Sequence, residues 1–432
     1  MKIKPHFFVR FIPVLALLAT VPVLGQDMID DATGLTYTVA EDQATVTGGT
    51  VPDDGRLVIP ETLGEHLVAA IGVRAFSGTD QNFNTSILSL EAPSVQTLEE
   101  KAFDYCTELK SFSLPVATSI GERAFHFCVD LATVSLPKAT SIGDWAFKDC
   151  GDLESVILPE AMSIGESAFR PCIKLEVIAL PKATSIGDKA FEGCRNLESV
   201  ILPEVISIGE SAFNSCDDLL TISLPKATSI GDRAFGDCSD LESVILPEAR
   251  SIGHGTFSSC FDLKTVFLPK AQSIEPFTFF NCFKLKGIYL GSDAKISHVI
   301  AFQDTPADLT IHYHPEHKDH FTSGSWAETG KNFNEVVRPF AQPVEIAADG
   351  SDAVLRIRHA DKAEGDDWTY AVEHSTNLSD REGWADAAPS SSGSATADGI
   401  VTKTRRFDGA ASAAFFRVGA SPTFMDLSPS QE

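Results

Sequence analysis

Basic residues are scarce in this chain of 432 residues, which carries 34 Lys and Arg against 60 Asp and Glu and has a formal net charge of −26. Nucleic-acid binding needs clustered Lys and Arg, so the acidic balance argues against DNA or RNA as a partner. It also disfavours docking on an anionic membrane. Tyr and Trp are rare, with five and four residues, whereas Phe reaches 29. The apolar fraction of 43% is ordinary, so the chain can build a core.

Long apolar runs are missing beyond the N-terminus, so we expect no membrane span in the mature chain. Three basic residues precede an apolar stretch over residues 11–23, and Gly25 closes a small-residue cleavage pattern. This pattern predicts a signal peptide over residues 1–25 and a secreted or cell-surface protein, extracellular or periplasmic. A retained membrane anchor is the alternative, although the stretch is shorter than the ~20 residues of a spanning helix.

Catalytic signatures are also missing. The sequence contains no G-x-S-x-G, no H-E-x-x-H and no G-x-x-x-x-G-K-[ST], and no C-x-x-C that would indicate a zinc knuckle or redox pair. We therefore predict a protein that is not an enzyme and uses no cofactor. A hydrolase remains a distant alternative, because scattered Asp and His residues allow a chance triad.

What the chain does have is a repeat. Nine cysteines recur at intervals of 22 residues, at Cys106, Cys128, Cys150, Cys172, Cys194, Cys216, Cys238, Cys260 and Cys282. A Phe stands three residues before each Cys and a Leu three residues after it. Nine copies at one spacing predict a solenoid, in which each turn buries its apolar side against its neighbours. A finer period of 44 residues indicates duplication of a two-turn unit.

The course of one turn follows from its residues. Val156 and Leu158 alternate as one short parallel strand requires, and Pro159 ends the strand because it cannot donate to a ladder. On the return side Ile164 is expected to point inward, and residues 166–169 fit a single short helical or 3₁₀ turn. Stacked turns would bury the Leu, Val, Leu, Ile, Ala, Phe and Cys columns as one continuous core.

The repeating turn I-G-x-x-A-F-x-x-C-x-x-L resembles the BspA-like leucine-rich repeats of secreted and cell-surface proteins. The resemblance covers roughly residues 35–330, with a divergent first turn at Ile71, Gly72, Ala75 and Phe76 and a degenerate last turn around Phe302. It implies a right-handed leucine-rich-repeat array that serves as an extracellular recognition scaffold, and some members are adhesins for host matrix proteins. The family has no catalytic motif, so only structural columns carry over.

A second, shorter region follows the repeat. Alternating runs at Val354–Arg358, Thr369–His374, Ile400–Phe407 and Ala414–Val418, with a Ser/Gly/Ala-rich loop at Pro389–Gly399, predict a small antiparallel β-sandwich. It resembles a module that ends many secreted bacterial proteins, and either attaches the chain to the cell envelope or only caps it. The predicted organisation is a signal peptide (1–25), an N-terminal cap with the divergent first turn (26–75), the solenoid with its C-terminal cap (76–335), a linker (336–343), the sandwich (344–420) and a tail (421–432).

The cysteines are predicted to be buried free thiols that act as small apolar spacers. In-register neighbours on adjacent turns would lie ~4.8 Å apart with parallel side chains. A disulfide needs Cβ atoms ~3.8 Å apart, so bridges would strain the ladder. The alternative is a disulfide framework, which secreted proteins favour.

The outward side of the short strands is the expected binding surface. Ile157, Ile201, Ile245 and Phe267 form an apolar column there, and we predict that they bind an extracellular protein or polysaccharide. Small hydroxyls form a neighbouring column, at Thr133, Ser155, Ser199, Thr221 and Ser243. Opposite charges alternate where the strands end, at Lys138, Glu160, Lys182, Glu204, Lys226, Glu248 and Lys270, and we expect them to pair without a ligand role.

Two further groups have metal-ligand chemistry. The return side carries one acid per turn, at Glu122, Asp144, Glu166, Asp188, Glu210 and Asp232. These acids are expected to be solvent-facing charges at the start of a helical turn, and a calcium ladder is the alternative. Four histidines stand within nine residues, at His312, His314, His317 and His320. A strand followed by a helix opening at Pro315 would let them bind zinc or copper, but such arrays also end in a strand, a Pro and a helix, so we expect a plain C-terminal cap and keep the metal site as the alternative.

Together these features predict a non-catalytic recognition or adhesion protein. The competing hypothesis is a structural component of the cell envelope without a discrete ligand. A regular, nearly identical array favours the structural hypothesis, whereas exposed Ile and Phe on the strands favour binding.

Overall fold

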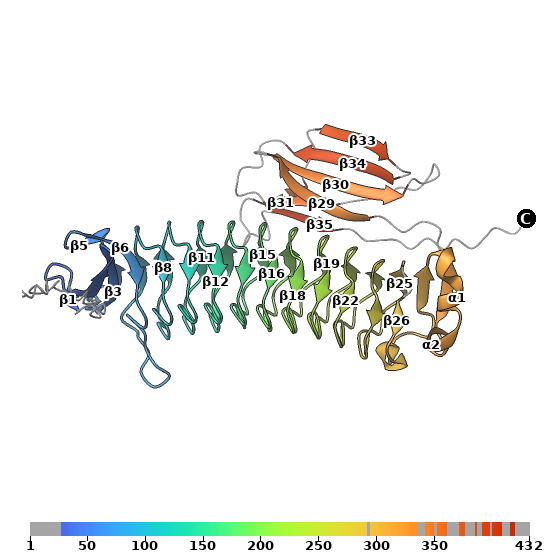
Figure 1. Ribbon diagram of the computed structural model, residues 1–432, viewed down its shortest axis with the longest axis horizontal. Coiled ribbons are helices and arrows are strands. Elements are labelled where there is room, and N and C mark those ends of the chain that lie inside the picture. The colour runs from blue at the N-terminus through green and yellow to red at the C-terminus, as the bar shows by residue number, and fades with distance from the viewer. Residues whose placement is uncertain are drawn as a thin grey trace, which may run out of the picture.

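The computed structural model describes residues 27–291 and 294–335, together with seven further strands between residues 342 and 419 by their backbone pairing (Figure 1). The predicted signal peptide (1–25) and tail (421–432) lie outside the described residues. Of the predicted linker, residues 336–341 also lie outside them, while its last two residues belong to strand β29.

Each 22-residue turn contains two short strands, where the sequence predicted one. In the turn around Leu158, β13 (Ser155–Ile157) is followed by β14 (Ser163–Ile164). The second strand was missed because two residues are too few to show an alternating pattern. Its Ser-Ile pair nevertheless aligns with the Ser-Ile pair of the next turn, Ser185 and Ile186. The solenoid therefore has two sheet-bearing sides.

The three- and four-residue strands form the first side, which we call the strand face. Thirteen of them follow one another along the described chain in four parallel sheets. They are β4 (Arg56–Val58), β7 (Ser89–Glu91), β9 (Ser111–Ser113), β11 (Thr133–Ser135), β13, β15 (Val177–Ala179), β17 (Ser199–Ile201), β19 (Thr221–Ser223), β21 (Ser243–Ile245), β23 (Thr265–Phe267), β25 (Gly287–Leu290), β27 (Thr310–Tyr313) and β28 (Asn332–Glu335).

The two-residue strands form the second side, the return side, and most of them belong to one continuous sheet that starts at the N-terminal cap. The cap consists of β1 (Met28–Ile29), β2 (Leu35–Ala40), β3 (Gln43–Gly49), β5 (Thr62–Leu63) and β6 (His66–Ile71). The sheet continues through β8 (Thr97–Leu98), β10 (Ser119–Ile120), β12 (Ser141–Ile142), β14, β16 (Ser185–Ile186), β18 (Ser207–Ile208), β20 (Ser229–Ile230) and β22 (Ser251–Ile252). A final pair comprises β24 (Ser273–Ile274) and β26 (Lys295–Ile296).

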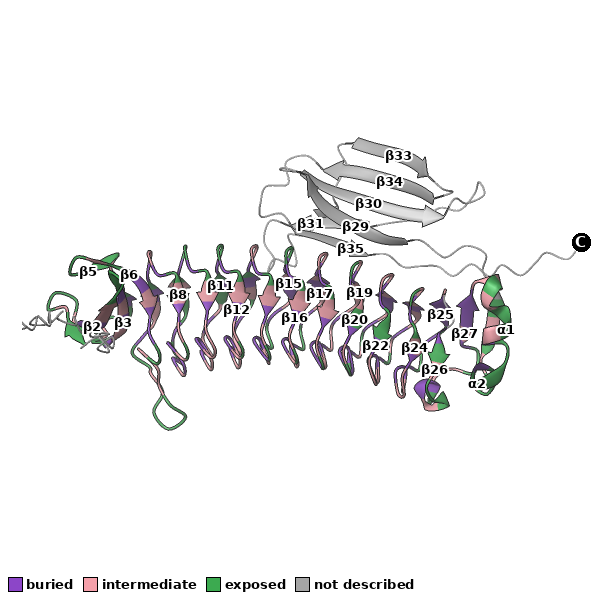
Figure 2. Cartoon of the chain, viewed as in Figure 1, coloured by how far each residue is buried: buried purple, intermediate pink, exposed green. Residues whose placement is uncertain are grey.

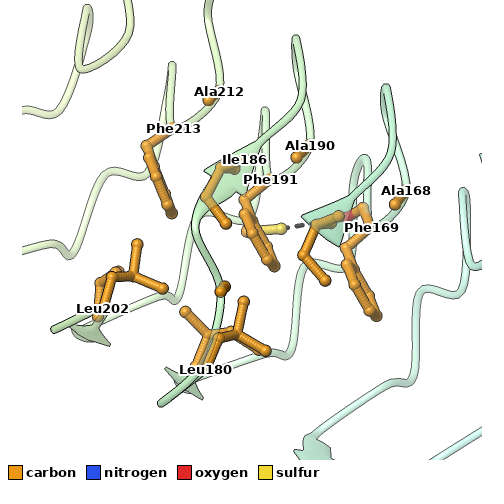
Figure 3. Packing of buried hydrophobic residues seen from close by; sticks show 14 of the residues in the cluster. Ala168, Phe169, Leu180, Ile186, Ala190, Phe191, Leu202, Ala212 and Phe213 are labelled. Carbon is orange, nitrogen blue, oxygen red and sulfur yellow. Dashed lines mark hydrogen bonds between the residues drawn. The ribbon is translucent and has the colours of Figure 1, made fainter. Parts of the chain in front are cut away.

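The core consists of the predicted columns, and every repeat contributes the same positions. In the turn of Phe169, the side chains of Leu158, Ile164, Ala168 and Cys172 are all buried. The Phe rings stack on one another along the whole array, with centroids 5.2–5.9 Å apart from Phe76 to Phe279. Figure 3 shows this stacking for Phe169, Phe191 and Phe213. The predicted continuous core is confirmed.

All nine cysteines are buried and free, as predicted. Each thiol also makes a contact that the repeat pattern did not reveal, since it donates to the carbonyl oxygen of the Phe in the preceding turn. Cys194 Sγ, for example, lies 3.2 Å from Phe169 O. Burial raises the pKa of Cys194 to about 12, so the thiol stays protonated and remains a donor. The Cys column therefore links each turn to the one before it.

The predicted helical turn on the return side is wrong, because the backbone there enters the left-handed region twice in most turns and once in the turn of Cys172. Arg123, Trp145, Ser167 and Lys189 have φ between 52° and 56°, and the residue before most of the cysteines has φ near 60°. Left-handed residues end a right-handed helical run at once, so the segment folds as consecutive tight turns. Figure 2 shows these segments as narrow loops without helical coils, with buried and half-buried stretches.

The C-terminal end of the solenoid is closed by η1 (Val299–Phe302), η2 (Pro315–His317), α1 (Lys318–Phe321) and α2 (Gly324–Ala327). The Phe stack ends there on Trp326, whose ring centroid lies 5.9 Å from that of Phe302. Among the described residues, no helix has the length and apolar character needed to cross a bilayer.

The seven strands beyond residue 341 pair in two antiparallel sheets. Their bounds are β29 (Gln342–Asp349), β30 (Asp352–Ala360), β31 (Ala371–Ser375), β32 (Ala385–Asp386), β33 (Ser391–Ala397), β34 (Ile400–Phe407) and β35 (Phe415–Gly419). The four predicted runs correspond to β30, β31, β34 and β35. The expected Ser/Gly/Ala-rich loop instead contains β33, which pairs antiparallel with β34. The sandwich packing of the two sheets stays a prediction.

Candidate ligand-binding surface

The strand face brings the four predicted apolar residues into one column. The parallel register aligns Ser135 with Ile157, Ala179 with Ile201, and Ile245 with both Ser223 and Phe267. Ile157 is 44% exposed, and the other three predicted residues are half-buried. With ~4.8 Å between adjacent turns, Ile157 and Phe267 are about 24 Å apart along the array. The column is long enough to contact an extended ligand or a protein surface.

The column continues beyond Phe267 into a residue that sequence reasoning missed. Tyr289 is aligned with Phe267, and their rings stack with centroids 5.1 Å apart and an interplanar angle of 13°. Tyr289 is only 5% exposed, so it supports Phe267 and offers little surface to a ligand. The next positions of the same column are His312 and Asn334. Tyr289 could have been found from its spacing of 22 residues from Phe267. The repeat is hard to recognise there because Gly291 stands where the earlier turns have Pro.

The neighbouring column carries the predicted small hydroxyls. Thr133 is aligned with Ser155, and Thr221 with Ser243. Val177 interrupts the series, because it is aligned with Ser199 and is buried. The strand face therefore combines an apolar column with a column that is mostly hydroxyl-bearing.

The alternating charges form ion pairs between consecutive turns, as predicted. Lys182 Nζ lies 2.6 Å from Glu160 Oε2, and the equivalent distances are 2.6 Å for Lys226–Glu204 and 2.7 Å for Lys270–Glu248. All of these side chains are about half exposed, so each pair contributes only ~0.2–1 kcal/mol. Each pair joins one Glu turn to the following Lys turn, which explains the 44-residue period.

The return-side acids have a role that differs from the expected helix-start charge. Asp144 Oδ1 accepts a hydrogen bond from the backbone N–H of Glu166 at 2.8 Å, and Asp188 Oδ1 accepts one from Glu210 N at 2.8 Å. Asp232 makes the same bond to His254 N. Within the described part of the chain, no group of three or more His, Cys, Asp or Glu side chains is arranged to hold a metal ion. Each of these three Asp side chains thus links its turn to the next one by a hydrogen bond to the backbone.

The structure does not bring the four histidines together. His312 lies on β27 with its Nδ1 3.4 Å from Asn334 Nδ2, and burial lowers its pKa. His314 and His317 flank the carboxylate of Glu316, at 3.4 Å and 3.2 Å. His320 Nε2 lies 2.7 Å from the carbonyl oxygen of Ala294, which ties the C-terminal helices to the last turns. These contacts match the expected C-terminal cap.

Comparison with protein families gives one match. The model of the BspA type leucine rich repeat region matches residues 69–198 and 184–308, in six copies, which is over half of the chain. A comparison with curated proteins gives no match.

Several solved structures are similar. A leucine rich cell surface protein from Faecalibacterium prausnitzii is 23% identical, with a TM-score of 0.37 over 70% of this chain and 98% of that one. A leucine-rich repeat protein from Bacteroides ovatus is 22% identical, with a TM-score of 0.37 over the same shares. The pneumococcal vaccine antigen PcpA is 18% identical, with a TM-score of 0.36 over 72% of this chain and 99% of that one.

Proposed function

Because the chain belongs to the BspA-type leucine-rich repeat family, we propose that it is a secreted or cell-surface protein that recognises an extracellular protein or polysaccharide through its strand face. The observation that carries the proposal is the in-register column of Ile157, Ile201, Ile245 and Phe267. These apolar side chains lie outside the continuous core and keep part of their surface exposed, and burying that surface against a partner would release about 25 cal/mol per Å².

The proposed contact combines two kinds of interaction. The Ile and Phe side chains would supply apolar area, and the adjacent hydroxyls of Thr133, Ser155 and Ser199 would hydrogen-bond to the partner. The charged pairs at the strand ends already neutralise each other, so they would frame the contact without adding much affinity. In this proposal the chain is a binding protein that catalyses no reaction and needs no cofactor.

A structural role in the cell envelope is the second candidate. Its support is the uniformity of the array, in which ion pairs, thiol–carbonyl bonds and Asp–backbone bonds repeat from turn to turn. In this alternative the strands beyond residue 341 attach the chain to the envelope, and the solenoid acts as a spacer.

A binding screen distinguishes the two. The full secreted chain would be immobilised and exposed to collagen, fibronectin, laminin, cellulose and chitin fragments in surface plasmon resonance. The recognition proposal expects saturable binding to at least one of them. Saturable binding to none of the five, by a chain whose melting curve shows that it is folded, would contradict the proposal and leave the structural role.

A further inference from the structure

The regular spacing of the array is broken near its N-terminal end. Phe76 and Phe103 stack on each other but are separated by 27 residues in the sequence, five more than the period. The additional residues lie in a loop, residues 77–86, that stands out from the array between β6 and β7 (Figure 1). Most of this loop is exposed (Figure 2).

The loop is nevertheless fixed to the solenoid. Gly78 N donates to the carbonyl oxygen of Asp104 at 2.7 Å, and Asn84 N donates to that of Tyr105 at 3.0 Å. The Asn84 side chain also donates to the carbonyl oxygen of Phe76 at 2.8 Å. These bonds hold both ends of the loop, and two backbone hydrogen bonds between Thr79 and Asn82 close its tip.

An aromatic cluster joins the loop to the next two turns. The ring of Phe83 stacks on Tyr105 and on Phe127, with both centroids 6.0 Å away, and Tyr105 and Phe127 lie 5.2 Å apart. Phe83 still exposes 45% of its surface. A large ring that is supported from one side and exposed on the other is a platform on which a flat, partly apolar ligand can stack.

The two supporting rings occupy a costly backbone position. Tyr105 and Phe127 have φ of 58° and 60°, where bulky residues are disfavoured. Later turns have Asp149, Gly193 or Ser215 at the same position, residue types that tolerate it better. The backbone of the turn therefore does not require aromatic side chains at these positions. The contact of the two rings with Phe83 offsets the cost of the left-handed backbone.

Polar groups surround the rings, and their charges restrict the ligand. Asp80, Gln81 and Asn82 are exposed at the loop tip and carry planar carboxylate or amide groups. Below the rings, His126 Nδ1 lies 2.7 Å from Asp104 Oδ1, and Lys148 pairs with Asp149. The inner carboxylates thus already have hydrogen-bonding partners, His126 for Asp104 and Lys148 for Asp149, so the site does not require a cation. The exposed acid at the tip disfavours an anion.

We propose that loop 77–86, together with Tyr105 and Phe127, binds an uncharged saccharide. The exposed side of the Phe83 ring would stack on the C–H face of a pyranose. Asp80, Gln81 and Asn82 would hydrogen-bond to its hydroxyl groups, since carboxylates and amides match adjacent hydroxyls well. This site involves none of the strand-face residues, so it is independent of the recognition proposed above.

The test measures binding of cellohexaose, maltohexaose, xylohexaose and chitohexaose to the full secreted chain by titration calorimetry, with heparin as an anionic probe. We expect binding to at least one of the four neutral hexasaccharides. Phe83→Ala should weaken it about tenfold or more, because stacking on one ring contributes about that factor. Phe83→Trp should retain it. Phe283→Ala removes another exposed Phe, 55% exposed and outside the loop, and should leave affinity unchanged.

Three results would overturn the proposal: no binding of any of the four hexasaccharides, equal binding by wild type and Phe83→Ala, or binding of heparin alone. Phe83→Trp guards against a loop that merely fails to fold in Phe83→Ala, since it keeps the stacked ring. The double variant Ile201→Ser/Ile245→Ser is measured beside Phe83→Ala: loss of hexasaccharide binding in Phe83→Ala places the site on the loop, whereas loss in the double variant alone would overturn this proposal and place saccharide binding on the strand face.

Discussion

Removing one ring from the middle of the Phe stack should destabilise the solenoid strongly. Phe191 is fully buried, and its ring lies 5.2 Å from both Phe169 and Phe213, at interplanar angles of 1° and 8°. Phe191→Ala deletes most of the side chain between two turns whose backbones are joined by strand pairing and hydrogen bonds on both sides. The space cannot close unless these bonds shift, so a cavity should remain.

The expected loss in unfolding free energy is about 3–5 kcal/mol, the usual cost of replacing a buried Phe by Ala. Two stacked ring contacts, each contributing ~0.5–1.5 kcal/mol, are part of that loss. Unfolding entropy is ~2.1 cal/mol/K per residue, so for a cooperative solenoid of roughly 300 residues each kcal/mol lowers Tm by about 1.6 °C, and the shift should be on the order of 5–8 °C.

Circular dichroism melting of the full chain is the assay, with Phe283→Ala as the matched control. Phe283 is 55% exposed and its ring stacks only on that of Phe261 among the described residues, so its replacement leaves no buried cavity and should cost at most ~0.5–1.5 kcal/mol. If Phe191→Ala and Phe283→Ala melted together with wild type, the stacked Phe column would contribute little to stability and the reasoning would be refuted.

Three further predictions concern contacts between turns. A thiol reagent should modify none of the nine cysteines in the folded chain and all nine after denaturation without reductant; fewer than nine would reveal disulfides. Asp188→Ala should cost ~1 kcal/mol in urea unfolding because it leaves the Glu210 N–H without its acceptor, whereas Glu166→Ala should cost under ~0.5 kcal/mol; equal costs would dismiss the Asp–backbone bond. Burial alone would lower the pKa of His126, but hydrogen bonds to Asp104 and Asp149 outweigh it and raise that pKa, so this stabilisation is present below pH ~6.5 and is lost as the pH rises through the raised value. His126→Gln should therefore destabilise the chain more at pH 5.5 than at pH 8.5, and a loss that is independent of pH would contradict the assignment.

The repeat predicted the core well because its spacing is a direct consequence of stacking. Each buried column requires the same residue type at the same position in every turn, so Phe, Cys and Leu recur at 22 residues. The strand-face column was predictable for the same reason, since residues that alternate with a buried Val or Ile must point outward.

Features shorter or rarer than the repeat could not be predicted. The two-residue strands leave no periodic signal, and left-handed backbone at Arg123 or Trp145 is not indicated by the residue type, because neither is a Gly or an Asn. The contacts of Phe83 depend on how the inserted loop folds back onto Tyr105 and Phe127. The repeat pattern carries no information about an insertion that occurs once.

The location of binding tests the central claim most directly. Affinity would be measured for the matrix protein or polysaccharide that binds in the screen, using Ile201→Ser/Ile245→Ser and, as the matched return-side variant, Asp188→Asn/Glu210→Gln. Fully burying an Ile side chain releases ~1.5–3 kcal/mol, and each of these half-buried Ile side chains has part of that left, roughly 1 kcal/mol, so the strand-face variant should lose about 2 kcal/mol and bind roughly 30-fold more weakly. The return-side variant should bind as wild type does. Unchanged affinity in the strand-face variant, with weakened binding in the return-side variant, would place the recognition surface on the return side and contradict the account.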